Sequence, residues 1–256
     1  MKKYVSNVSY SRKFSFYTLV TNMTEYKEMV LTAENSGFDK EKADFYYFDN
    51  TFENSYDGYK AINLAIKNSD ALYIIVCHQD ILFKFDDCDY LIEKIEEVNK
   101  LDPNWAVLGN AGRNNKGEYF INITDPNGRQ KIGKFPNEVM SLDENFLVIN
   151  ARASIGCSNN LNGFHLYGTD LCQNANYLGY SCYVIDFHLY HKSAGKLNED
   201  FFKCRKDYIS LQKYRKKSEI IYTACTKFYC SNNSFLNYFF NFKLMNKIYR
   251  IVKGIN

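Results

Sequence analysis

The sequence predicts an α/β fold in which helices flank a mainly parallel, doubly wound sheet. The first observation is that apolar strand-like runs alternate with helix-like segments over the first hundred residues, with short links between them. Connections of this strand–helix–strand kind place successive strands parallel, with right-handed crossovers. The second observation is the run over 71–77, which has no polar side and is typical of a strand buried on both faces.

Each element of this first part follows from its own pattern. In chain order the patterns predict a strand over 14–21, a helix over 25–35, a strand over 44–48, a helix over 59–67 and the strand over 71–77. Gly37 suits a position just past a helix end. Ala61, Ile62 and Ala65 recur at helical spacing, so we expect the helix over 59–67 to pack one face on the sheet.

The second part is less regular. Its patterns predict a helix over 90–100, a strand over 105–108, a hairpin or flexible insertion over 113–134, a strand within 139–150, a loop over 151–163, a helix over 169–178 and a strand over 180–187. From Phe201 onward the chain becomes basic and aromatic, and we expect helix there. The sequence therefore predicts two domains, residues 1–200 and a basic, aromatic helical extension over 201–256.

Charge is distributed unevenly between these two parts. From Lys203 to the end there are twelve basic and two acidic residues, a net charge of +10, so the rest of the chain carries −7 within a total of +3. An acidic body repels phosphate, so we do not expect a nucleic-acid partner. The aromatic and basic stretch over 235–252 is either a helix packed on the domain or in a homodimer interface, or a membrane-surface contact.

Cysteines and apolar runs indicate the compartment. The eight cysteines form no C-x-x-C pair, which argues against a zinc knuckle and favours a reducing cytosol. The N-terminus lacks the apolar run of a signal peptide, and no run approaches the roughly 20 residues of a membrane span. We expect a cytoplasmic protein, with peripheral binding at the inner face of the membrane if the tail contacts lipid.

Candidate functional residues follow the buried strand over 71–77. His78, Gln79 and Asp80 come directly after it, where open α/β sheets bind ligands. The other three histidines, His165, His188 and His191, lie far downstream, and we expect the two groups to face each other across one site. Residues three apart on an extended chain point to opposite faces, so at most one of His188 and His191 enters that site.

Asp170 is a second candidate, because it falls in the first turn of a predicted helix. The helix dipole stabilises a carboxylate there and lowers its pKa, which suits a base or ligand that is ionised at neutral pH. An ordinary acid at a helix start has the same signature.

Together these segments resemble a known family. After the three strands come HQD over 78–80, W-x-V-x-G-x-A-G over 105–112, LDENFLVINAR over 142–152, G-F-H-x-Y-x-x-D over 163–170, and a strand that ends in His with Ser-x-Gly after it. This order resembles the GT-A glycosyltransferases of the family-2-like group that includes the streptomycin-biosynthesis-type domain. The resemblance covers roughly residues 14–195 and implies a GT-A (Rossmann-like), mostly parallel sheet.

The resemblance also implies an activity. A nucleotide-sugar donor would bind at the strand ends, through Thr21, Asp49, Asn50, His78, Gln79 and Asp80. Asp80 would meet the diphosphate, directly or through Mg²⁺ or Mn²⁺, and His191 would complete the metal or phosphate site. Asp170 would be the catalytic base for an acceptor hydroxyl, with Asp143 and His165 on the acceptor side.

The implied reaction is transfer, by inversion, to a glycan or lipid-linked glycan in bacterial surface polysaccharide or lipopolysaccharide biosynthesis. Two departures from the family pattern leave alternatives open. HQD supplies one carboxylate where D-x-D supplies two, and Gly168 stands where many relatives have a second acid. The alternatives are a non-catalytic protein that binds nucleotide or carbohydrate, and a metal-dependent hydrolase that uses His78, Asp80 and His191.

Overall fold

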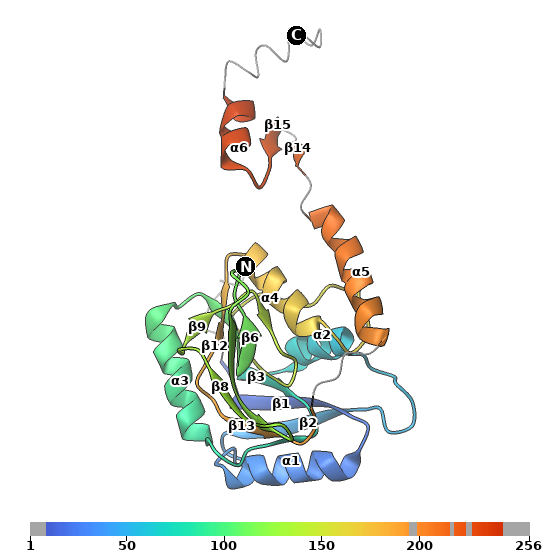
Figure 1. The fold of residues 1–256 in the computed structure, drawn as a ribbon, viewed down its shortest axis with the longest axis vertical. Helices are drawn as coiled ribbons and strands as arrows, with labels where there is room; N and C mark the ends of the chain where they lie inside the picture. Colours follow the sequence, from blue (N-terminus) through green and yellow to red (C-terminus); the bar gives the residue numbers. More distant parts are fainter. Residues whose placement is uncertain (1–8, 195–198, 216–217, 224–226, 243–256) are drawn as a thin grey trace, which may run out of the picture. The chain divides into compact units, whose positions relative to one another are not determined.

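The protein forms two compact units, Met1–Arg205 and Lys206–Asn256. The computed structural model describes residues 9–194, 199–215, 218–223 and 227–242 (Figure 1). The sequence predicts a domain boundary after residue 200, where the basic, aromatic composition begins. The division between the two units lies five residues later.

The larger unit is built on a seven-stranded sheet of order β2-β1-β3-β11-β5-β12-β9. Its strands are β1 (Arg12–Val20), β2 (Ala43–Asp49), β3 (Ala71–Cys77), β5 (Trp105–Gly109), β9 (Asn137–Glu138), β11 (Phe146–Asn150) and β12 (Ser181–Val184). Strand β1 runs parallel to both β2 and β3. Strand β11 enters between β3 and β5 and is antiparallel to both of them, whereas β12 is parallel to β5.

A second sheet has the order β10-β6-β7-β13-β4, with β8 paired to β7. Its strands are β4 (Ile81–Leu82), β6 (Ala111–Arg113), β7 (Tyr119–Asp125), β8 (Gly128–Ile132), β10 (Ser141–Leu142) and β13 (Leu189–His191). All of these pairs are antiparallel except β13 with β7. The predicted insertion over 113–134 is the hairpin of β7 and β8.

The prediction of a GT-A (Rossmann-like), mostly parallel sheet is wrong. The molecule is a mixed, partly antiparallel α/β protein with two sheets in the larger unit. The three strands on which the prediction rested are parallel, because a helix connects each to the next. After β3, short connections make β6, β7 and β8 antiparallel neighbours, and β11 enters the main sheet antiparallel to β3 and β5.

Four helices accompany these sheets in the larger unit: α1 (Met23–Asn35), α2 (Gly58–Asn68), α3 (Cys88–Leu101) and α4 (Tyr167–Tyr177). The side chains of Asn22, Asp57 and Asp87 cap the first three, each accepting backbone N–H bonds. Helices α1 and α2 lie on opposite sides of β1 (Figure 1). The main core is aromatic, with Phe14, Phe16, Phe38, Trp105 and Phe146 fully buried.

The smaller unit departs from the helical extension that the sequence predicts. Helix α5 (Glu199–Arg215) crosses the division between the units, and it is followed by an antiparallel hairpin of β14 (Glu219–Tyr222) and β15 (Lys227–Cys230). Helix α6 (Ser234–Asn241) contacts β15. Most of the predicted segment over 235–252 lies outside the described residues. None of the helices in the described ranges has both the length and the apolarity of a membrane span.

Candidate metal centre and adjoining cavity

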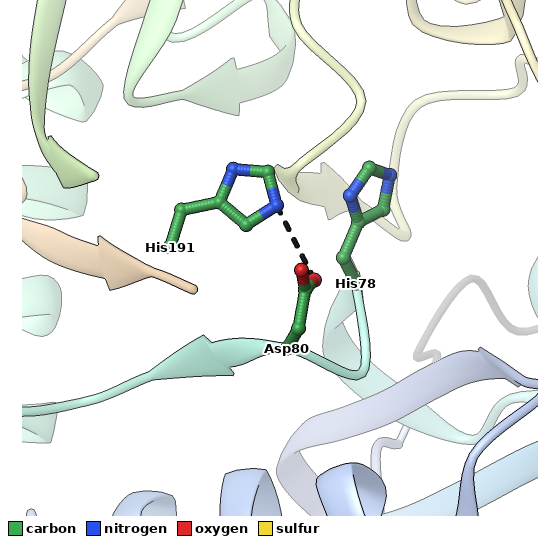
Figure 2. A group of neighbouring side chains, drawn as sticks. All are labelled: His78, Asp80 and His191. Atoms are coloured by element: carbon green, nitrogen blue, oxygen red, sulfur yellow. Dashed lines mark ion pairs between the residues drawn. The ribbon is translucent and has the colours of Figure 1, made fainter. Parts of the chain in front are cut away.

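Strand pairing brings two distant parts of the chain together around a group of three polar side chains. His78 and Asp80 lie between β3 and β4, and His191 ends β13. Strand β13 pairs antiparallel with β4, with His191 opposite Ile81, and this register sets His191 beside Asp80. One potential ligand atom from each of His78, Asp80 and His191 lies within 4.8 Å of the others. Figure 2 shows the two imidazoles on either side of the carboxylate.

The electrostatics of this group favour the protonation states that bind a cation. Burial would raise the pKa of Asp80, but hydrogen bonds from His191 and Ser193 outweigh burial and hold this pKa well below its usual value. Burial, followed by the nearby charge of His191, lowers the pKa of His78. A carboxylate and a neutral imidazole are the forms that donate electron pairs to a metal. Nε2 of His191 lies 3.3 Å from Oδ1 of Asp80.

These residues fit the divalent cation that the sequence resemblance implies. Two imidazole nitrogens and one carboxylate oxygen suit a transition metal such as Mn²⁺ or Zn²⁺, whereas Mg²⁺ prefers oxygen ligands alone. Three protein ligands also leave coordination positions for a substrate. The resemblance implied Asp80 and His191 as metal ligands and placed His78 in the donor site, whereas the hydrolase alternative used all three residues, which the structure brings together.

Neighbouring groups position His78. Its backbone N–H donates to the carbonyl of Asn145, over 3.0 Å, directly before β11. The hydroxyl of the buried Tyr167 lies 3.4 Å from its Nε2. Because Tyr167 is the first residue of α4, the metal group is connected to the start of that helix.

A cavity of about 460 Å³ adjoins the metal group. Its wall contains the imidazoles of His78 and His191, an acidic pair, Asp143 and Glu144, and an apolar and aromatic surface. The remaining lining residues are Ala111, Tyr119, Ile121, Ile123, Asp125, Gln130, Asn145, Phe164, His165, Ser193, Ala194 and Phe201. The two residues predicted for the acceptor side, Asp143 and His165, therefore lie in the same wall as the metal group.

Glu144 is the cavity residue that sequence reasoning missed. Its Oε1 accepts the backbone N–H of Gly168, over 3.3 Å, in the first turn of α4. Burial and then the charge of Asp143 raise the pKa of Glu144 to about 8. A carboxyl that exchanges its proton near neutral pH is suited to acid–base chemistry. The sequence feature that could have identified Glu144 is its position next to Asp143 in the LDEN segment, which is part of the family resemblance.

A strained turn places the side chains at the start of α4. Leu166 has φ of 65°, the one positive value at a non-glycine position in the described ranges. This conformation is unfavourable for a bulky L-residue, so the surrounding structure must enforce it. The preceding carbonyl, of His165, accepts a 2.9 Å bond from the hydroxyl of Tyr59, which is buried. His165 thus lines the cavity, where its ring lies edge-on to Phe201, while Tyr167 is buried.

Asp170 does not fit the role of a base that meets an acceptor. Its side chain is 0% exposed, and it is absent from the described residues that line the cavity. The carboxylate accepts the backbone N–H of Ser158 over 2.7 Å, the hydroxyl of Ser158 over 2.8 Å and the amide of Asn174 over 3.2 Å. We therefore assign Asp170 a structural role, joining the loop before α4 to the helix.

Close packing explains why residue 168, two positions before Asp170, is a glycine. A Cβ at Gly168 would lie 2.6 Å from the carbonyl oxygen of Leu142 and 3.5 Å from the Cγ of Glu144. A second acid at Gly168 has no room in this arrangement, and the carboxylate beside the helix start comes from Glu144 instead.

The residues predicted to bind the nucleotide lie at the ends of β1 and β2. Gln79 accepts the backbone N–H of Thr21 over 2.8 Å and donates to the Thr21 hydroxyl over 3.0 Å, so it joins the end of β1 to the metal loop. The Asn50 side chain exchanges two hydrogen bonds with the backbone of Tyr56. Hydrogen bonds from Thr51 lower the pKa of Asp49. Thr21, Asp49 and Asn50 are not among the described residues that line the cavity.

His188 points away from the metal group. Its ring stacks on Phe85 at a centroid distance of 3.8 Å, and its Nε2 lies 2.8 Å from the Thr124 hydroxyl. Burial and then the charges of Arg129 and Lys131 lower the pKa of His188 to about 4. Of the pair His188 and His191, only His191 lines the cavity.

The chain is similar in sequence to a known protein over most of its length. No protein-family model matches the chain. The crystal structure of A197 from STIV aligns with 73% of this chain and 97% of that chain, with a TM-score of 0.40 and 11% sequence identity. The protein named "ATP synthase subunits region ORF 6" of Fuscovulum blasticum is 33% identical over 210 residues, which cover 79% of this chain and 84% of that protein. Because this identity extends over most of both proteins, the chain belongs to the same family as ATP synthase subunits region ORF 6.

Proposed function

We propose that the protein is a metal-assisted glycosyltransferase that moves a sugar from a nucleotide-sugar donor to an acceptor hydroxyl. The observation that carries the proposal is that one cavity joins a group suited to a metal and diphosphate to a group suited to proton transfer. The first is His78, Asp80 and His191, and the second is Glu144 beside Asp143. The proposal rests on these side chains and on the motif resemblance, not on the sheet topology.

The donor side consists of the metal group and the strand ends next to it. A cation held by His78, Asp80 and His191 would neutralise charge on the departing nucleoside diphosphate. Gln79 and Thr21 fix the loop between this group and the end of β1. Asp49, at the end of β2, would accept hydrogen bonds from the ribose.

The acceptor side consists of Glu144, Asp143 and His165. The acceptor oxygen attacks the anomeric carbon while the carboxylate of Glu144 takes its proton, and the bond from that carbon to the diphosphate oxygen breaks. The nucleoside diphosphate leaves with the bonding electrons, and a single displacement of this kind inverts the anomeric centre. The N–H of Gly168 orients Glu144, and Asp143 and His165, which line the same cavity, would bind other acceptor hydroxyls.

A metal-dependent hydrolase is the second candidate. The observation in its favour is the ligand set, because three protein ligands with open positions also describe catalytic zinc sites. In that reaction the acceptor would be water, and no nucleotide would be needed. The apolar side of the cavity wall, including Ile121 and Ile123, favours an organic acceptor over water.

A thermal-shift panel separates the two functions. We expect one of UDP, GDP, CDP or TDP to raise the unfolding temperature in the presence of Mn²⁺. A ligand that binds only the native state adds about 2.7 kcal/mol at a hundredfold excess over its Kd. Asp80→Asn should remove the Mn²⁺-dependent part of the shift, and the exposed Asp89→Asn serves as the matched control.

The enzymatic test uses the nucleotide that binds. We expect the corresponding nucleotide sugar to release nucleoside diphosphate, faster when a glycan acceptor is added. Stabilisation by Zn²⁺ with no effect of any nucleotide would contradict the transferase and support the hydrolase. Nucleotide binding without turnover of any nucleotide sugar would instead support a non-catalytic binding protein.

A further inference from the structure

In the smaller unit, asparagine side chains fix one side of α6 against the hairpin. The amide of Asn241 donates to the Tyr229 carbonyl over 2.8 Å, and its Oδ1 accepts the Tyr229 N–H over 2.9 Å. One turn earlier, the amide of Asn237 donates to the Ser231 carbonyl over 2.8 Å. The side of α6 that carries Asn237 and Asn241 is therefore held on the hairpin.

Three aromatic residues at other positions of α6, together with Phe242 just after the helix end, are exposed to solvent. Phe235, Tyr238 and Phe239 have the spacing of neighbours on a helix surface. The exposed fractions of Phe235, Tyr238, Phe239 and Phe242 are 70%, 71%, 40% and 49%. The rings of Phe235 and Phe239 stack at 6.0 Å, and those of Tyr238 and Phe242 are 5.9 Å apart. An apolar surface of this kind marks an interaction site.

The charge of the chain around this helix indicates the partner. The residues from Lys206 to the end include ten basic and two acidic ones, a net charge of +8, and α6 itself has no charged residue. A second copy of this unit would carry the same positive charge and be repelled. A surface of anionic lipid complements the charge and offers the headgroup layer, where aromatic rings are favoured.

The dimensions of α6 determine how it would meet a bilayer. Eight residues of helix extend about 12 Å, far less than the roughly 30 Å of a hydrocarbon core. A helix of this length lies in the interface with one face inserted, and does not cross the membrane.

We infer that Phe235, Tyr238, Phe239 and Phe242 form a docking face for an anionic lipid bilayer. The aromatic rings enter the headgroup layer while the basic residues of the unit attract the surface. This inference does not depend on the proposed function, but it would bring the larger unit to acceptors that are anchored in lipid.

Co-sedimentation of the full chain with vesicles tests the inference. We expect binding to vesicles of phosphatidylglycerol and phosphatidylcholine, weaker binding at high salt, and little binding to phosphatidylcholine alone. Phe235→Ser combined with Phe239→Ser should weaken binding at least about tenfold, because both rings lose their apolar contact with the bilayer. The matched control is Phe52→Ser, a 98% exposed phenylalanine in the larger unit that should bind as the original chain does.

A second measurement guards against a variant that fails to fold. Tyr238→Trp places an indole on the docking face, whereas the single native tryptophan, Trp105, is 0% exposed in the larger unit. We expect the emission of this variant to shift to the blue with phosphatidylglycerol vesicles and not with phosphatidylcholine. Equal vesicle binding by the original chain and the double variant, or no shift with either lipid, would overturn the inference. Concentration-dependent dimerisation that the double variant abolishes, without vesicle binding, would show that a second copy covers the face.

Discussion

Two carboxylates meet the first turn of α4 from different sides, and they differ in what surrounds them. Asp170 belongs to the helix and points inward, where Ser158 and Asn174 supply its hydrogen bonds. Glu144 comes from the segment before β11 and faces the cavity, where the backbone N–H of Gly168 donates to it over 3.3 Å. The same helix start therefore holds one carboxylate as structure and leaves the other available for a reaction.

The comparison teaches that a favourable local position does not identify a catalytic acid. The helix dipole acts on any carboxylate in the first turn, so it cannot distinguish the two residues. They are distinguished by access to a ligand, because only Glu144 of the two lines the cavity. Asp170 lacks access, whereas Glu144 has access and a pKa raised to about 8 by burial and Asp143.

The largest expected effect is on stability, at Asp170. We expect Asp170→Ala to lower the free energy of unfolding by about 3–5 kcal/mol, because the N–H and hydroxyl of Ser158 lose a buried charged partner. Urea denaturation measures the change. A matched control is Asp89→Ala, which removes an exposed acid at the start of α3.

Asp170→Asn sharpens the same test, because it keeps the shape and one acceptor oxygen. We expect a smaller loss of stability, and catalytic activity close to normal in the fraction that is folded. Loss of activity in a fully folded Asp170→Asn variant would restore Asp170 as the base and contradict the structural role.

The next effect is on turnover, at Glu144. We expect Glu144→Gln to lower kcat by about a hundredfold, equivalent to about 2.7 kcal/mol, because the glutamine amide cannot take a proton. The protein should stay folded, since the amide can still accept the Gly168 N–H. Initial rates of nucleoside diphosphate release, measured against pH, check this. In the original chain the rate should rise with pH toward a plateau above pH 8, and an unchanged rate in the variant would remove Glu144 from the mechanism.

Local elements were largely predictable from the sequence, while the way they pair was not. The strand over 71–77 was predicted with the bounds that the structure shows, because an apolar run between polar residues defines its own ends. The antiparallel entry of β11 between β3 and β5 depends on contacts far apart in the chain, which periodicity does not encode. The parallel prediction extrapolated from the first three strands to strands with other connections.

The site shows the same limit at the level of single residues. We expected His78 and Asp80 to face a downstream histidine, and the structure groups them with His191. This was predictable because His78 and Asp80 follow one strand and His191 ends another. Asp170 was predicted as the base without considering Glu144, since a helix start predicts a carboxylate but not its burial or the direction of the cavity. Gln79 and Asn50 were assigned to a ligand, but their side chains already hold backbone groups of the protein.

The smallest expected effect is a pH dependence of stability. It tests whether Glu144, unlike an ordinary exposed carboxylate, keeps its proton near neutral pH in the folded protein. The folded protein keeps a proton on Glu144 up to a pKa of about 8, whereas the unfolded chain loses it near its ordinary value of 4.5. The folded state therefore binds more protons between these values, so the free energy of unfolding falls as pH rises through this window. Because Glu144 is only partly buried, we expect a fall of about 1–2 kcal/mol.

Urea denaturation at several pH values should show this slope in the original chain and a flatter one in Glu144→Gln. Asp143→Asn should move the window to lower pH, because it removes the charge that adds to burial; if both variants keep the original slope, Glu144 does not hold a proton in the folded protein.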